Sequence, residues 1–161
     1  MSISEEISSA LAREFAIPDV GEATILIVRL LTAAVLGGLV GFERERKGRA
    51  AGLKTHILVS LGSALFVLAP LQAGVSAADV TRVMQGIVSG IGFLGAGAII
   101  KLDQGERVEG LTTAAGVWMT AAIGMAAGMG MEVVALITTI IALVVVSALP
   151  KVFGSGTSMH D

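Results

Sequence analysis

Charged residues make up only 15% of this chain, and many of them lie in one stretch from Glu43 to Lys54. This stretch holds five basic and two acidic residues, and Glu43 and Lys47 have the i, i+4 spacing that favours an ion pair on a helix. One interpretation is a solvated charge run that orients the chain in a membrane. The other is an ordered network at Glu43, Arg44 and Glu45 that contacts a protein or anionic lipid.

Carboxylates near this stretch are numerous enough to bind Mg²⁺, which usually takes one or two of them and keeps several waters. The surrounding cations argue against a simple cation site. Because the chain has no cysteine and only two histidines, any metal site must use oxygen ligands. We therefore expect no cofactor other than a possible Mg²⁺ ion. The carboxylates are Glu43, Glu45, Asp103, Glu106 and Glu109.

Arg29 is the only full charge well inside a predicted membrane helix. It lies roughly 9 Å along that helix, so its side chain could reach the interface, or it could serve as a functional charge in a polar cavity. Asp79 and Glu132 are its candidate partners. Gln85 and Ser89, four residues apart on another predicted helix, also need partners inside a bilayer.

Hydroxyl groups at Thr55, Thr112 and Thr113 follow the predicted cytoplasmic loops and complete the set of candidate functional residues. No nucleophile with a nearby histidine base is apparent, and no carboxylate pair lies in the membrane, so we expect no enzyme. His56 is interpreted as a membrane-interface residue. Nothing in the sequence indicates nucleic-acid binding.

Five apolar segments position these residues, and each approaches the roughly 20 helical residues needed to cross a bilayer. With 54% hydrophobic residues and a mean hydropathy of +0.86, the sequence predicts an all-α membrane bundle of five transmembrane helices. The segments are 23–42, 55–73, 82–100, 111–130 and 133–149.

The chain divides into an amphipathic segment at 1–20, a transmembrane domain at 21–150 and a flexible tail at 151–161. Residues 1–20 do not resemble a cleaved signal peptide, because acidic residues stand where a basic region is expected. If the first helix runs inward, eight Lys and Arg residues lie in the cytoplasm and two outside. This bias predicts an inner-membrane protein with its N-terminus outside and its C-terminus in the cytoplasm.

A weak internal repeat pairs residues 32–69 with residues 90–127, nine of which are identical. Its best part aligns Gly52-Leu53-Lys54-Thr55 with Gly110-Leu111-Thr112-Thr113, where a loop enters a helix. Two parallel helical hairpins plus a fifth helix would result. Chance matching of apolar, glycine-rich segments is the alternative.

Glycines are frequent at helical spacing, and in lipid they let helices approach closely. Tight packing within the chain or between protomers is one interpretation, and a kinked or unwound helix between Val83 and Ile100 is another. The predicted packing positions are Gly37, Gly41, Gly86, Gly90, Gly92, Gly95, Gly97, Gly124 and Gly128.

Four ordered motifs resemble the bacterial MgtC/SapB family: residues 37–45, 51–56, 90–100 and 110–115 with Trp118. Arg29 stands where that family commonly has an arginine. The resemblance implies an inner-membrane protein linked to magnesium limitation and, in several pathogens, to virulence. It also implies either magnesium transport or restraint of the F-type ATP synthase. This chain ends at Asp161, without the soluble domain that follows the helices in the family's best-described member.

Two function classes therefore remain. In the first, the chain regulates another membrane complex, or a second copy of itself, through its helix faces and cytoplasmic loop. In the second, a homo-oligomer, most simply a dimer, carries Mg²⁺ or another small ion along a path lined by Arg29, Gln85, Ser89 and several hydroxyl groups. We favour the regulator, because the densest charge cluster is mixed and cytoplasmic.

Overall fold

The computed structural model describes residues 2–15, 19–101 and 108–147. Within these ranges the chain forms six α-helices and one short antiparallel hairpin, in which Ile100 pairs with Glu109 and Lys101 with Val108. The elements are α1 (Ile3–Glu14), α2 (Val20–Arg46), α3 (Leu53–Gln72), α4 (Ala77–Gly97), β1 (Ile100–Lys101), β2 (Val108–Glu109), α5 (Leu111–Gly128) and α6 (Glu132–Ser147).

Short polar residues and glycines determine where the helices begin. Ser2 and Glu5 form a reciprocal capping box at the start of α1, and the Asp19 side chain accepts two backbone N–H groups at the start of α2. Helices α3 and α5 begin directly after Gly52 and Gly110. These two glycines are the equivalent positions of the predicted repeat.

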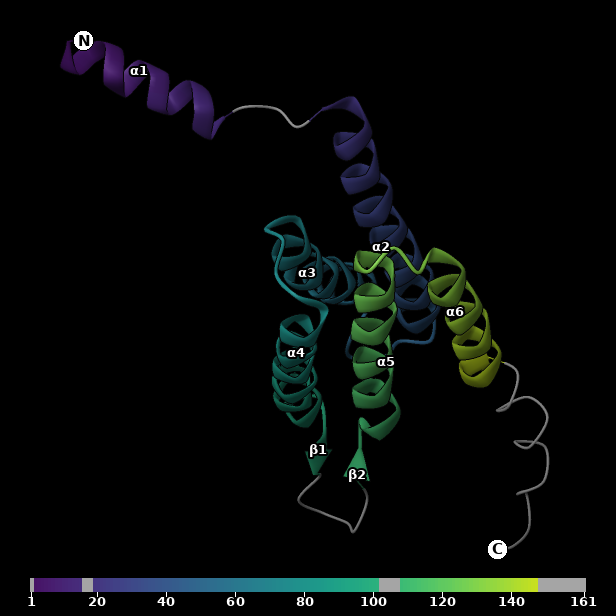
Figure 1. The fold of residues 1–161 in the computed structure, drawn as a ribbon. Coiled ribbons are helices and arrows are strands. Elements are labelled where there is room, and N and C mark those ends of the chain that lie inside the picture. Colours follow the sequence, from purple (N-terminus) through teal and green to yellow (C-terminus); the bar gives the residue numbers. More distant parts are fainter. Residues whose placement is uncertain (1, 16–18, 102–107, 148–161) are drawn as a thin grey trace, which may run out of the picture.

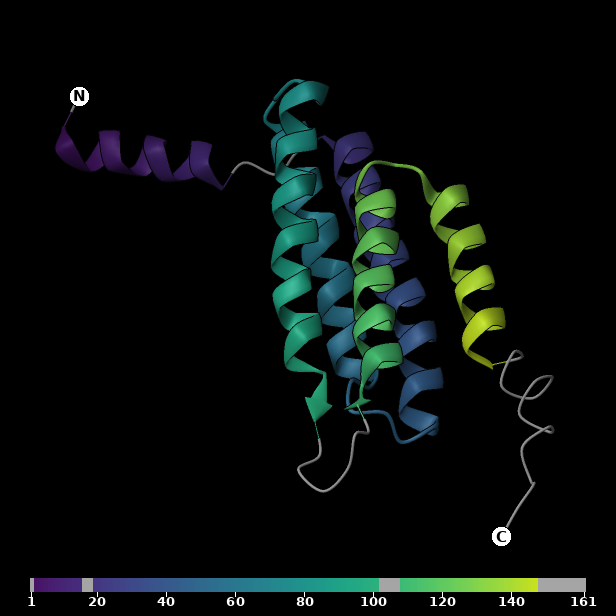
Figure 2. The ribbon, with the colours of Figure 1, turned by 90° about the horizontal axis from the view of Figure 1, so that it is seen from below.

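Helices α2 to α6 run alternately up and down in one bundle, and α1 contributes no buried residue (Figure 1, Figure 2). One end of the bundle carries the α2–α3 loop, the β1–β2 hairpin and the end of α6, and we call it the charged end. The opposite end carries the start of α2 and the turns that join α3 to α4 and α5 to α6 (Figure 2).

Helices α2, α3 and α5 form the centre of the bundle. Helix α4 packs on α3 and α5, and helix α6 packs on α2 and α5. Small side chains dominate the largest buried cluster, so the helix backbones lie close together. Its members are Ala33, Leu36, Val40, Ala64, Ile123, Ala127 and Ala135.

The distribution of polarity is that of a protein dissolved in lipid. Large apolar side chains such as Leu39 and Leu58 are exposed, whereas Arg44, His56 and Thr120 are buried. Helices α2, α3 and α5 are long and apolar enough to cross a membrane. The two others expected to do so, α4 and the described part of α6, do not reach these limits, so the prediction of five transmembrane helices is supported only in part.

Candidate functional site

At the charged end, the last turn of α2 buries a charged side chain. Arg44 is 2% exposed, and its Nη1 lies 3.8 Å from Oε2 of Glu43. The other two guanidinium nitrogens, Nε and Nη2, have no hydrogen-bond partner, and neither does Glu43 Oε2. A guanidinium in this position faces the protein rather than water.

Two polar side chains on α3 share this region, and both are fully buried. The His56 Nδ1 donates a hydrogen bond to the Gly52 carbonyl at 2.9 Å, because a carbonyl oxygen can only accept. In the neutral ring Nε2 is then an acceptor; it faces Gly116 of α5 and has no partner. Ser60 lies one helical turn further along α3, and its hydroxyl also lacks a partner.

We call Glu43, Arg44, His56 and Ser60 the polar cluster. Among the described residues, these four hold every side-chain nitrogen or oxygen that is completely shielded from solvent and has no hydrogen-bond partner. His56 lies within electrostatic range of both Glu43 and Arg44. Because nearly all buried polar groups in folded proteins are paired, such a concentration of unpaired atoms identifies a candidate site.

The chemistry of the polar cluster favours water or an anionic group over a metal cation. The Nε and Nη2 edge of Arg44 is the fork that binds a carboxylate or phosphate through two parallel hydrogen bonds. The Arg44 charge opposes a divalent cation, and no group of three or more His, Cys, Asp or Glu side chains that could hold a metal occurs in the described ranges.

Glu43 also connects the polar cluster to α6. Its Oε1 accepts hydrogen bonds from Lys47 Nζ at 2.5 Å and from Ser147 Oγ at 3.1 Å. Lys47 also donates to the Val146 carbonyl at the end of α6. The predicted Glu43–Lys47 pair therefore forms, and the link to α6, which the sequence did not indicate, extends it into a network.

Arg29 has a different partner from those expected. It is half-buried, and its Nη1 donates to the Gly128 carbonyl at 3.2 Å, at the end of α5. Asp79 pairs instead with Arg82, at 2.9 Å. Among the described residues Arg29 forms no ion pair, so its predicted pairing with Asp79 or Glu132 is wrong. A positive charge at a helix C-terminus satisfies a free carbonyl and interacts favourably with the helix dipole.

The remaining candidates are spread over the bundle. Glu45 accepts the Leu53 backbone N–H at 2.7 Å and so caps α3. Thr113 is buried, whereas Thr55, Thr112, Gln85 and Ser89 are exposed, the last two on α4. Asp103 and Glu106 lie outside the described residues. The structure thus brings Glu43 and Arg44 together but leaves Asp79, Gln85 and Ser89 away from the polar cluster.

His56, interpreted from the sequence as a membrane-interface residue, has no exposed surface and is buried beside Ser60 and Arg44. The sequence did not indicate this grouping. The i, i+4 spacing of His56 and Ser60 puts both on one face of α3, and this spacing was the signal that could have identified the pair.

The predicted packing glycines separate into two groups. A Cβ added at Gly37 would lie 2.6 Å from the Ser60 Cβ, and one at Gly41 would lie 2.8 Å from the Leu53 Cα. A Cβ at Gly124 or Gly128 would collide with the backbone of α3. These four glycines let α2 and α5 contact α3 directly, while Gly95 makes an ordinary contact with Ala114 of α5.

The second group lies on α4, where an added Cβ would meet nothing within 4 Å. Its members are Gly86, Gly90, Gly92 and Gly97. Their predicted role in packing is therefore wrong within the protomer. The alternative of a locally unwound helix is not observed, because α4 is continuous from Ala77 to Gly97.

A model of the MgtC family matches residues 30–154, which include the polar cluster and all of α3, α4 and α5. The chain belongs to the MgtC family. MgtC family membership and the apolar helices together show a membrane protein.

The chain is similar to three relatives along most of its length. Protein SrpB of Synechococcus elongatus is 42% identical over 137 residues, covering 78% of this chain and 75% of SrpB. The putative magnesium transporter YhiD of Escherichia coli is 40% identical, covering 74% of this chain and 58% of YhiD. Protein MgtC of Salmonella typhimurium is 45% identical, covering 73% of this chain and 49% of MgtC. The chain therefore spans only about half the length of YhiD and MgtC. No solved structure matches it.

Proposed function

We propose that this chain is an inner-membrane regulator in magnesium homeostasis, which acts on another membrane complex through its helix faces and its charged end. The observation that carries the proposal is the direct packing of α2 and α5 on α3, with unpaired polar atoms that extend from the charged end into this core. The magnesium connection rests on MgtC family membership and on the name of its relative YhiD.

The packing of the central helices supports regulation over transport. Gly37, Gly41, Gly124 and Gly128 bring backbones so close that a methyl group does not fit between them. Hydrated Mg²⁺ keeps several waters and needs a wide path lined with oxygen ligands. The interface between α2, α3 and α5 therefore has no space for such a path.

The arrangement of charges supports a cytoplasmic contact. Exposed Arg46, Lys47, Arg49 and Lys54 surround the polar cluster at the charged end, and basic loops are retained in the cytoplasm. We therefore place this end in the cytoplasm, with α2 to α6 as five crossings. The F-type ATP synthase is the first partner to test, because the MgtC/SapB resemblance indicates it.

Growth at low magnesium tests this proposal in a bacterial strain that lacks the gene. Wild-type protein is expected to restore growth, and the Arg29→Gln, Glu43→Gln and Arg44→Gln variants are expected to insert but fail. Arg46→Gln is the matched control, because Arg46 is exposed in the same turn as Arg44. Normal growth with all three test variants, at equal membrane levels, would contradict a role for these charges.

The alternative is a Mg²⁺ carrier formed by two or more copies, which the name of YhiD favours. It is tested by Mg²⁺ uptake into proteoliposomes that contain the purified full chain. Saturable uptake that Glu43→Gln abolishes would establish transport and overturn the regulator. If folded protein gives no uptake above empty liposomes, the carrier is excluded and the partner search continues.

A further inference from the structure

Helix α1 contributes nothing to the core of the bundle. None of its residues is buried, although a capping box fixes its start and Arg13 lies in its last turn. An isolated helix of 12 residues is only marginally stable in water, because few backbone hydrogen bonds offset the cost of nucleation. A helix of this length therefore needs a surface to lie on.

One side of α1 is apolar along its whole length. Four apolar side chains recur every fourth residue, which aligns them on one side of the helix, and each is more than half exposed. Each residue adds about 100° of rotation, so Ser9 and Arg13 lie on the other side of the helix. We call the apolar set the α1 stripe; its members are Ile3, Ile7, Leu11 and Phe15.

The position of α1 follows from its connection to α2. Helix α2, which is long and apolar enough to cross a membrane, begins at Val20. The residues between Glu14 and Val20 reach at most about 20 Å even when fully extended, so the end of α1 stays near the membrane surface where α2 begins. In both views α1 extends sideways from the start of α2, across the direction of the bundle helices in Figure 2 (Figure 1, Figure 2). A helix in that position lies along the plane of the bilayer.

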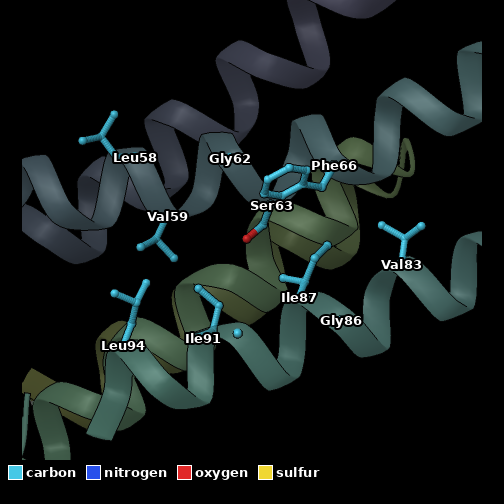
Figure 3. Close-up of a pocket in the computed structure, with 11 residues that line it drawn as sticks. Leu58, Val59, Gly62, Ser63, Phe66, Val83, Gly86, Ile87, Ile91 and Leu94 are labelled. Carbon is cyan, nitrogen blue, oxygen red and sulfur yellow. The ribbon is translucent and has the colours of Figure 1, made fainter. Parts of the chain in front are cut away.

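One alternative surface within the chain is an apolar groove of about 690 Å³ between α3 and α4 (Figure 3). It extends from Leu58 to Phe66 on α3 and from Val83 to Leu94 on α4, so it runs along the helices of the bundle. If α1 lay in this groove, its charged side chains would enter hydrocarbon, which costs free energy. At the bilayer surface they stay in water while the α1 stripe is buried. These side chains are Glu5, Glu6, Arg13 and Glu14.

We propose that α1 lies flat in the headgroup layer on the side where α2 begins, with the α1 stripe turned toward the acyl chains. Amphipathic helices of this kind bury their apolar side about 5–10 Å into the boundary between headgroups and chains. Phe15 and Val20, at the two ends of the connection, are both more than three quarters exposed, so the apolar surface does not end where α1 does. The inference does not depend on the proposed regulatory function, since a carrier would be anchored in the same way.

The charges of α1 determine which lipids it fits. Among its side chains three carboxylates stand against one guanidinium, and Glu5 and Glu6 lie in the first turn, where carboxylates stabilise a helix. A negative helix is repelled by anionic lipid, so the contact depends on buried apolar area and suits a zwitterionic surface. In this respect α1 is the opposite of the basic charged end.

Single-cysteine fluorescence tests this placement in the full chain, which has no cysteine of its own. An environment-sensitive dye on Ile7→Cys, in proteoliposomes of phosphatidylcholine, is expected to emit at shorter wavelength than the same dye on Ser9→Cys. Lipids that carry a nitroxide near the headgroup should quench the Ile7→Cys dye more than lipids with the nitroxide at the chain end. Ser9→Cys, on the other side of the same turn, is the matched control and should show little of either effect. Leu11→Cys and Arg13→Cys repeat the comparison one turn later.

A second change removes the apolar contact. Ile7→Ser and Leu11→Ser together, with the dye on Ile3→Cys, take two large apolar side chains from the α1 stripe. They are expected to shift the helix about tenfold or more toward release from the lipid. Because α1 buries nothing in the bundle, thermal unfolding of the bundle should not change. Phosphatidylglycerol added to the vesicles should weaken the quenching in the unsubstituted stripe.

Three results would overturn the proposal. Equal, water-like emission from Ile7→Cys and Ser9→Cys would mean that α1 lies free in water. A shielded Ile7→Cys dye that no lipid nitroxide quenches would mean that protein covers the α1 stripe, either the bundle or a second copy. Stronger quenching from the chain ends than from the headgroups would place α1 inside the bilayer.

Discussion

Arg44 has the most unusual environment of any single residue in the described structure. Its guanidinium is buried with two unpaired nitrogens, beside a carboxylate that Lys47 and Ser147 already engage. Leaving buried donors unpaired costs roughly 1–3 kcal/mol each, so a side chain kept in this state is better explained by function than by stability. The unpaired Nε and Nη2 groups of Arg44 would donate hydrogen bonds to a bound water or to an acidic group of a partner.

Replacing Arg44 by methionine should therefore stabilise the protein while abolishing its function. Removing a buried charge in favour of an apolar side chain of similar length is expected to raise the unfolding free energy by about 1–3 kcal/mol. Thermal unfolding in detergent measures this change, with the exposed Arg46→Met as the control expected near zero. A lower unfolding temperature for Arg44→Met would instead show that the guanidinium is a structural group.

At the scale of elements, the contact of α2 and α5 with α3 depends on glycines, because a side chain at these positions would push the helices apart. A Cβ at position 124 would collide with the Ser60 carbonyl, whereas one at Gly97 would meet nothing within 4 Å. Replacing glycine by alanine should therefore change the free energy of unfolding differently at these two positions.

Gly124→Ala is expected to lower the unfolding free energy by about 1–3 kcal/mol, the usual cost of overpacking. Gly97→Ala should be neutral or stabilising by up to about 1 kcal/mol, because alanine favours helix more than glycine does. Equilibrium unfolding of both variants by the same denaturant compares them. If Gly124→Ala matches wild type, the helices are further apart than described.

Much of this arrangement could be predicted from the sequence, because helices and loops follow local patterns. The apolar segments predicted the positions of α2 to α6 to within a few residues, and the glycines at 52 and 110 indicated where α3 and α5 begin. Packing was harder to predict. Gly86/Gly90 and Gly124/Gly128 have identical spacing, and only the position of each helix in the bundle separates a packed pair from an unpacked one.

The partners of the charged residues could be predicted less well, for a physical reason. Arg29 binds a backbone carbonyl 99 residues away, and no side-chain pattern marks such an acceptor. Asp79 forms an ion pair with Arg82, three residues further along α4, rather than with a residue distant in the sequence. The sequence did not single out His56, because Arg44 of α2 comes close to it only when α2 packs on α3.

For the whole molecule, the alternating helices predict which loops face each side of the membrane. The α2–α3 loop lies at the charged end and the α3–α4 turn at the opposite end (Figure 2). Because basic loops stay in the cytoplasm, the two should differ in access from outside.

Single cysteines at Ala50 and Val75 test this topology, since both positions are exposed and no native cysteine interferes. A membrane-impermeant maleimide should label Val75→Cys in intact spheroplasts. It should label Ala50→Cys only after the membrane is permeabilised. Labelling of Ala50→Cys alone from outside would invert the assigned orientation, and equal labelling of both would mean that α3 does not cross.

The glycine contacts also bear on how the protein can move. Helices whose backbones touch cannot slide or rotate without collision, so α2, α3 and α5 must travel as one rigid body. Helix α4 meets this body mainly through side chains along its length, with Ile91 in a cluster with Val117 and Ala121 and Val80 in a cluster with Val67 and Met125. A displacement of α4 would therefore require these side chains to repack, while the central helices move together.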